Sequence, residues 1–216
     1  MTTIAYVEKK CAVCKAVHEY IALSSTNAFG SPDLDLRPPE MQRSTMSYWV
    51  QECPECGYAA YKVSDPCMID AAFLKREEYV SCEGIGFVSD LAKTFYRQYM
   101  ISLQEGRIKD AFFAALHAAW ACDDEPDVKN AEKCRLLSIP LITDLIDKND
   151  AEKENLLLIK ADLLRRTRRF NELIAEYRNV RFESETLNKV IAFQIEKAQA
   201  EDPYCYRVSD AVKDRS

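Results

Sequence analysis

Glycine and histidine are scarce in this sequence. Its 216 residues include five glycines and two histidines. The one glycine pair close in sequence, GIGF at residues 84–87, is too short to form a phosphate-binding loop. His18 and His117 offer no partner to activate a serine or cysteine in a catalytic triad. These shortages argue against a triad-type hydrolase, and we expect a protein that is not an enzyme.

Long apolar runs and an excess of positive charge are also missing. No run approaches the roughly 20 apolar residues that span a bilayer. The first residues, MTTIAYVEKK, contain no apolar block behind a basic flank, as a secretory signal would. We therefore expect no membrane binding and a cytoplasmic location, where thiols stay reduced. The formal net charge is −6, so binding to nucleic acid would need a local basic patch.

Cysteine, in contrast, is abundant, with nine residues. Four of them form two CxxC pairs, Cys11-Ala-Val-Cys14 and Cys53-Pro-Glu-Cys56. In a reducing compartment, metal binding explains clustered pairs better than disulfides do. Zn²⁺ binds four thiolates tetrahedrally at about 2.3 Å, and each CxxC turn can present two. The sequence therefore predicts a structural Zn²⁺ site with Cys11, Cys14, Cys53 and Cys56 as ligands, closed to catalysis.

The residue after each CxxC pair is expected to need a positive φ angle. Gly57 suits this conformation in the second pair, and Lys15 holds the equivalent place in the first. Three other interpretations carry less weight. The first is an active dithiol, which would need a surrounding strand–CxxC–helix unit that this sequence lacks. The second is an iron–sulfur cluster. The third is a zinc site in which His18 or Cys67 replaces one of the four cysteines.

The two parts of the chain differ in composition. Residues 1–62 contain turn formers and short alternating stretches that predict strands at residues 4–7, 19–23 and 46–51. A proline-containing loop at 27–45 lies between the last two. Residues 63–216 are rich in helix formers. We predict an α+β protein, mostly α, with a zinc-ribbon-like module at residues 1–62 and a helical domain at residues 63–216.

Helix signals fill the second part. Ser89 is a candidate N-cap, Pro140 should kink its helix, and Asn149 with Glu152 fits a capping box. The predicted helices cover residues 66–80, 90–103, 107–122, 126–147, 155–166, 171–180 and 184–200. Segments beginning at Gly106 and at Arg168, 62 positions later, partly fit a tetratricopeptide pattern. An irregular helical bundle is the alternative.

One stretch resembles a known family. The segment NAFGSPDLDLRPPEMQRSTMSYWVQECPECGYAAY, with CAVCK upstream, is similar to an uncharacterised family of bacterial proteins. Its members pair an N-terminal double-CxxC domain with C-terminal tetratricopeptide-like helices. The resemblance is specific over residues 10–61, although Ala12 and Lys15 depart from the usual CPxCG form. It implies zinc binding at the four cysteines of the CxxC pairs and no established reaction.

Two groups of charged residues are candidates for binding a partner. In the proline-containing loop, Asp33, Asp35 and Arg37 either form a recognition surface or tie the loop down by hydrogen bonds and ion pairs. The second group is a basic cluster that either meets nucleic acid or an acidic peptide, or is a solvated helix end. Its members are Arg165, Arg166, Arg168, Arg169, Arg178 and Arg181.

Together these features predict a non-enzymatic, zinc-binding interaction scaffold whose helical domain binds a protein partner. One alternative is a nucleic-acid-binding protein that uses the zinc module and the basic cluster between Arg165 and Arg181. Another is a redox-responsive switch in which oxidation of the thiolates ejects the metal.

Overall fold

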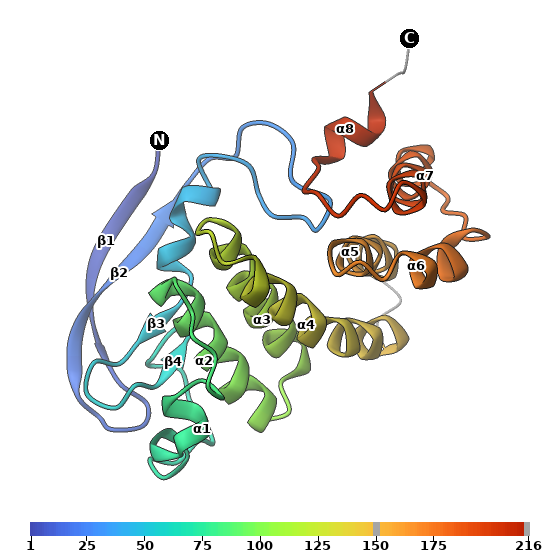
Figure 1. Ribbon diagram of the computed structural model, residues 1–216. Coiled ribbons are helices and arrows are strands. Elements are labelled where there is room, and N and C mark those ends of the chain that lie inside the picture. Colours follow the sequence, from blue (N-terminus) through green and yellow to red (C-terminus); the bar gives the residue numbers. More distant parts are fainter. Residues whose placement is uncertain (149–151, 214–216) are drawn as a thin grey trace. The chain divides into compact units, whose positions relative to one another are not determined.

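Two small antiparallel sheets precede a series of helices in the computed structural model, which describes residues 1–148 and 152–213 (Figure 1). The protein is therefore α+β and mostly α, as predicted. It forms two compact units. Unit 1 comprises Met1–Ala28 and Glu40–Cys134, and unit 2 comprises Phe29–Pro39 and Arg135–Ser216.

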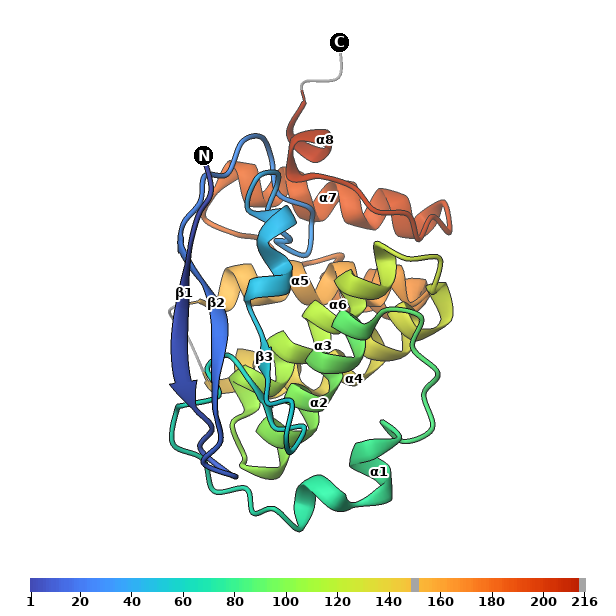
Figure 2. The same ribbon diagram turned by 90° about the vertical axis from the view of Figure 1, so that its left-hand side faces the viewer.

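Unit 1 begins with a long β-hairpin. Strands β1 (Thr3–Lys10) and β2 (Val17–Ser25) pair antiparallel, with Lys10 opposite Val17 and Tyr6 opposite Ile21. The two strands run together along their length as a twisted ribbon (Figure 2). Because Lys10 and Val17 are paired, the chain between them turns sharply, and this turn carries the first CxxC pair. The strands predicted at residues 4–7 and 19–23 are confirmed.

The second sheet is much smaller. Strands β3 (Gln51–Glu52) and β4 (Ala59–Ala60) flank the second CxxC pair. The strand predicted at residues 46–51 is wrong for all but its last residue, since Arg43–Tyr48 forms the 3₁₀ helix η1. Local hydrogen bonds favour the tight turns: the Thr45 hydroxyl donates to the Gln42 carbonyl at 2.7 Å and accepts from the Trp49 indole N–H at 3.0 Å. An alternation over six residues does not reveal such bonds.

The segment after β4 is less helical than its sequence predicts. Only the 3₁₀ helix η2 (Phe73–Lys75) and the short helix α1 (Glu77–Val80) form within residues 66–80. The Asp70 carboxylate accepts a hydrogen bond from the Phe73 N–H at 2.8 Å, which starts a separate turn. The predicted single helix over this stretch is therefore wrong.

Two long helices, α2 (Asp90–Gln104) and α3 (Ile108–Asp123), form most of the remainder of unit 1. Ser89 caps α2, because its hydroxyl accepts a hydrogen bond from Ala92 N–H at 3.3 Å. Helix α3 packs against α2, and its small buried residues permit a close approach. These are Ala111, Ala114, Ala115, Ala118 and Ala119. Helix α4 (Val128–Lys148) begins in unit 1 and contains Pro140 without ending there.

Unit 2 contains α5 (Lys153–Arg166), α6 (Phe170–Tyr177), α7 (Glu185–Gln199) and the short α8 (Val208–Val212). Asn149, the predicted start of the capping box, lies outside the described residues. Helices α5 and α6 both contact α7. Among the described residues, no helix has the length and apolar character that crossing a membrane requires.

The hairpin turns α2–α3 and α5–α6 have the same geometry. In the first, Gly106 has φ 69° and the Arg107 N–H donates to the Ser102 carbonyl at 2.9 Å. In the second, Arg168 has φ 58° and the Arg169 N–H donates to the Leu164 carbonyl at 2.8 Å. Both are Schellman turns, which end a helix with a left-handed residue. Whether these hairpins belong to a tetratricopeptide array stays a prediction.

The division into two units differs from the predicted boundary after residue 62. Cys11 and Cys53 share one buried cluster with Tyr79 and Ile101, which follow the predicted boundary. The loop segment Phe29–Pro39 belongs instead with the C-terminal helices. No local sequence signal predicts either of these two groupings, because each brings together residues that are far apart in the chain.

Candidate metal centre

The four cysteines of the CxxC pairs converge on one point. Their sulfur atoms all lie within 4.8 Å of one another. The Cys11 Sγ–Cys56 Sγ distance is 3.7 Å and the Cys14 Sγ–Cys53 Sγ distance is 3.6 Å. A tetrahedron with metal–sulfur bonds of about 2.3 Å has sulfur–sulfur edges of about 3.8 Å. The two shortest contacts thus match the edges of such a tetrahedron, and all the sulfurs are close enough to share one ion, while both contacts are far beyond the roughly 2 Å of a disulfide.

Each CxxC pair forms the same backbone turn. The Cys11 N–H donates to the Ala16 carbonyl at 2.8 Å, and the Cys53 N–H donates to the Tyr58 carbonyl at 2.8 Å. The residue after each pair has the predicted positive φ, 66° at Lys15 and 73° at Gly57. We call these turns the first knuckle (residues 11–15) and the second knuckle (residues 53–57). Each points two sulfurs to the same side.

Hydrogen bonds hold both knuckles to the rest of unit 1. The Ala12 N–H donates to the Val63 carbonyl at 2.7 Å, which ties the first knuckle to the segment after β4. The Tyr79 hydroxyl donates to the Gly57 carbonyl at 2.6 Å, which ties the second knuckle to α1. The Gln51 side-chain oxygen accepts from the Lys9 ammonium at 3.1 Å and from the Val63 N–H at 3.3 Å.

The cysteines differ in burial and in proton affinity. Cys11 and Cys53 are fully buried, Cys56 is half-buried and Cys14 is exposed. Burial raises the pKa values of the Cys53 and Cys56 thiols, since a buried thiolate loses its hydration. A hydrogen bond from the Ala16 backbone N–H lowers the pKa of Cys14. A bound metal ion would stabilise the thiolate forms of Cys53 and Cys56.

Neighbouring polar residues do not enter the sulfur cluster. The His18 Nε2 atom lies 3.6 Å from a Glu55 carboxylate oxygen. The Lys15 ammonium donates to the Ala12 carbonyl at 2.5 Å. Burial near the cysteines raises the pKa of Tyr20 to about 12. Neither His18 nor Cys67 belongs to the group of potential ligands found in the described part of the chain.

The sequence did not reveal the ionic contacts behind the second knuckle. Glu52, one residue before Cys53, forms an ion pair with Arg97 of α2 and accepts a hydrogen bond from the Thr94 hydroxyl at 3.0 Å. The Arg97 guanidinium also lies over the Tyr79 ring, 5.7 Å from its centroid. The partners are about 40 residues apart in sequence, and no local pattern links them.

The charged loop residues are buried. Asp33, Asp35 and Arg37 are 3%, 2% and 5% exposed. The Asp35 carboxylate accepts from the Arg37 N–H at 3.2 Å, and the Asp33 N–H donates to the Arg37 carbonyl at 2.9 Å. Backbone pairing between Asp33 and Arg207 joins the loop to the C-terminal segment. Of the two interpretations, this burial favours the one in which these residues tie the loop down. It argues against an exposed recognition surface.

One member of the predicted basic cluster, Arg165, lies in the core of unit 2. Arg165 is 0% exposed, and its guanidinium donates to Asp162 Oδ1 at 2.5 Å and to the carbonyls of Asp202 and Tyr204 at 2.9 and 2.6 Å. Arg165 therefore cannot form part of an exposed patch without unfolding its surroundings. Arg166 and Arg169 are half-buried.

Comparison of the chain with protein families, curated proteins and solved structures gave no match. The resemblance to the double-CxxC bacterial family therefore stays a prediction.

Proposed function

We propose that this chain is a non-enzymatic zinc-binding scaffold protein, in which Cys11, Cys14, Cys53 and Cys56 hold one structural Zn²⁺. The observation that carries this proposal is the convergence of the four sulfurs within 4.8 Å of one another. Four thiolates are a donor set that zinc prefers. A site with four protein ligands leaves no open coordination position, which favours a structural role over a catalytic one.

The metal's proposed task is to join two weak pieces of structure. The first knuckle closes a two-stranded ribbon, and the second lies between strands of two residues each. Isolated two-stranded hairpins are marginally stable in water. Metal binding that requires the folded arrangement of ligands contributes directly to folding stability. The ion would therefore fix the β-hairpin and β3–β4 against the helices of unit 1.

Metal analysis tests the proposal directly. We expect the purified protein to contain one zinc per chain, and Cys53→Ser to abolish that stoichiometric binding. Cys205→Ser is the matched control, because Cys205 is an exposed cysteine of unit 2. Chelation should lower the melting temperature of the wild-type protein. Protein without zinc after expression in zinc-supplemented medium, or a full equivalent bound by Cys53→Ser, would contradict the proposal.

A redox-responsive zinc switch is the second candidate. It is favoured by the exposure of Cys14, which makes one ligand accessible to oxidants. Zinc release by low doses of peroxide, reversed by a thiol reductant and zinc, would support it. Retention of zinc at those doses would contradict the switch, and only the structural role would remain.

A further inference from the structure

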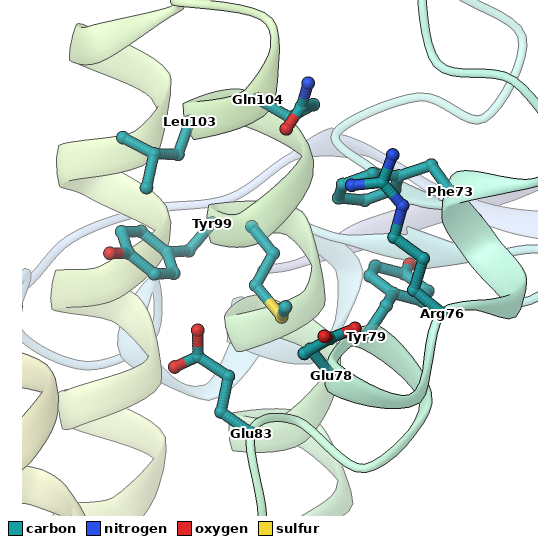
Figure 3. Close-up of a pocket in the computed structure, with 9 residues that line it drawn as sticks. Phe73, Arg76, Glu78, Tyr79, Glu83, Tyr99, Leu103 and Gln104 are labelled. Atoms are coloured by element: carbon teal, nitrogen blue, oxygen red, sulfur yellow. The ribbon is translucent and has the colours of Figure 1, made fainter.

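A pocket of about 300 Å³ lies in unit 1, between helix α2 and the segment that contains η2 and α1 (Figure 3). Three aromatic residues line it: Phe73, Tyr79 and Tyr99. Each has less than a tenth of its surface exposed, so their rings form fixed walls. The pocket also contains three charged residues, Arg76, Glu78 and Glu83.

In the part of the chain that the structure describes, neither glutamate of the pocket forms an ion pair. Within the described residues, the Glu78 side chain makes no hydrogen bond or ion pair. The Glu83 carboxylate accepts a hydrogen bond from the Tyr96 hydroxyl at 2.5 Å and forms no ion pair with any described residue. In Figure 3, this carboxylate points into the space between Tyr99 and Glu78. The pocket thus presents two carboxylates without ion pairs beside aromatic rings, and Arg76 is the one cation among its lining residues.

The backbone holds Glu83 in place at a cost in strain. Cys82, Glu83 and Gly84 have consecutive positive φ angles of 50°, 55° and 73°. Left-handed conformations are unfavourable for residues other than glycine, and they concentrate at functional sites. Here the strained turn, together with the hydrogen bond from Tyr96, directs the carboxylate toward the pocket.

The pocket already attracts one cation of its own. The Arg76 guanidinium lies over the Phe73 ring, 5.1 Å from its centroid. Aromatic faces attract cations, and carboxylates at the same place strengthen the attraction. The combination of aromatic walls and two carboxylates that form no ion pair with a described residue is complementary to a lysine or arginine side chain, with its apolar stem and charged end.

We propose that this pocket binds a lysine or arginine side chain of a partner protein. This inference rests on the proposed scaffold function and names the class of partner segment. A second hollow of about 250 Å³ shares Phe73, Arg76 and Gln104 with the pocket, so residues flanking the basic side chain have a surface to contact. The net charge of −6 favours approach of a basic segment.

The pocket and the proposed zinc site are linked through Tyr79. Its ring lines the pocket, and its hydroxyl donates to the Gly57 carbonyl of the second knuckle at 2.6 Å. Phe73 and Tyr79 also belong to the buried cluster that contains Cys11 and Cys53. Loss of zinc should therefore loosen one wall of the pocket and weaken binding of the partner segment.

Peptide binding to the zinc-loaded protein tests the proposal. The probe is a pentapeptide with neutral ends and a central lysine, acetyl-AAKAA-amide, and the control peptide has norleucine in place of lysine. We expect saturable chemical-shift changes at residues of the pocket with the lysine peptide only. Glu83→Gln should weaken binding about tenfold, as loss of a charged hydrogen-bonding partner does. Glu77→Gln removes the same charge one residue before Glu78, outside the pocket, and should change binding less than twofold.

The outcomes separate this inference from the zinc proposal, since zinc content is measured on every variant. No binding by fully zinc-loaded protein, equal binding of the norleucine peptide, or equal losses in Glu83→Gln and Glu77→Gln would each overturn the pocket proposal. Binding of methylamine as tight as that of the peptide would overturn a protein segment as the ligand. Binding by protein that never contains zinc would overturn the zinc proposal and leave the pocket in place.

Discussion

Arg165 illustrates how the role of one residue depends on its surroundings. In the sequence it belongs to a run of arginines, which predicts a basic surface. In the structure its guanidinium contacts the Asp162 carboxylate and two backbone carbonyls and lies over the Tyr206 ring, 5.4 Å from the centroid. Asp162 precedes it by three residues, a separation at which helix side chains meet. The carbonyl partners follow about 40 residues later and could not be predicted.

Arg165→Met should destabilise the protein strongly. The substitution keeps an apolar stem but removes the partner of the buried Asp162 carboxylate and of two backbone carbonyls, and breaking a buried ion pair in this way costs about 3–5 kcal/mol. Denaturant unfolding followed by circular dichroism measures the change.

Arg169→Met is the matched control for this change. Arg169 pairs with Glu172, and both side chains are more than a third exposed, so the loss should be below about 1 kcal/mol. Equal losses in the two variants would show that the buried contacts of Arg165 contribute nothing beyond a surface pair.

At the scale of elements, the knuckles and the hairpin turns follow most closely from local sequence. The CxxC spacing and Gly57 predicted the turns that present the sulfurs. The serine cap of α2 was equally visible, because capping depends on residues within one helical turn. The stretch at residues 66–80 was not predictable in this way, since its helix-favouring residues are overridden by the hydrogen bond that the Asp70 carboxylate accepts from Phe73 N–H and by the strained turn after α1.

The two Schellman turns predict opposite changes in stability for one substitution that removes glycine and one that adds it. Gly106→Ala places a Cβ atom at φ 69° and should destabilise the protein by about 1 kcal/mol. Arg168→Gly removes a Cβ atom at φ 58° and should stabilise the α5–α6 turn by up to about 1 kcal/mol.

Thermal melting of both variants and of the wild type measures these effects. Because Arg168 is exposed, replacing its side chain loses little packing. The sign of the change in melting temperature therefore reports the backbone strain at this position. A stabilised Gly106→Ala would contradict the turn geometry.

At the scale of the whole molecule, the least predictable feature is the division of the chain between the units. The composition change near residue 62 correctly separates strand-rich from helix-rich sequence. It does not show that the helices α2 and α3 share a unit with the CxxC pairs, or that residues 29–39 join the C-terminal segment. Such groupings depend on packing between distant segments, which no local periodicity encodes.

A chain that ends at Pro203 tests the second grouping. In the full protein, the Leu34 N–H donates to the Tyr206 carbonyl and the Val208 N–H donates to the Pro32 carbonyl, each at 2.9 Å. Without residues 204–216, the loop loses these partners, and limited proteolysis should cut it faster, by about tenfold or more. Zinc content should stay unchanged, because all four cysteines belong to unit 1. Unaltered cleavage would contradict the anchoring of the loop.

The pairing of Leu34 with Tyr206 also sets an order of events during translation. Tyr206 follows Leu34 by 172 residues, so the ribosome makes the loop well before its partner. At rates of roughly 5–20 residues per second, the intervening residues take on the order of ten seconds or more. During that interval a nascent chain carries Asp33, Asp35 and Arg37 without the segment around Tyr206 that pairs with their loop.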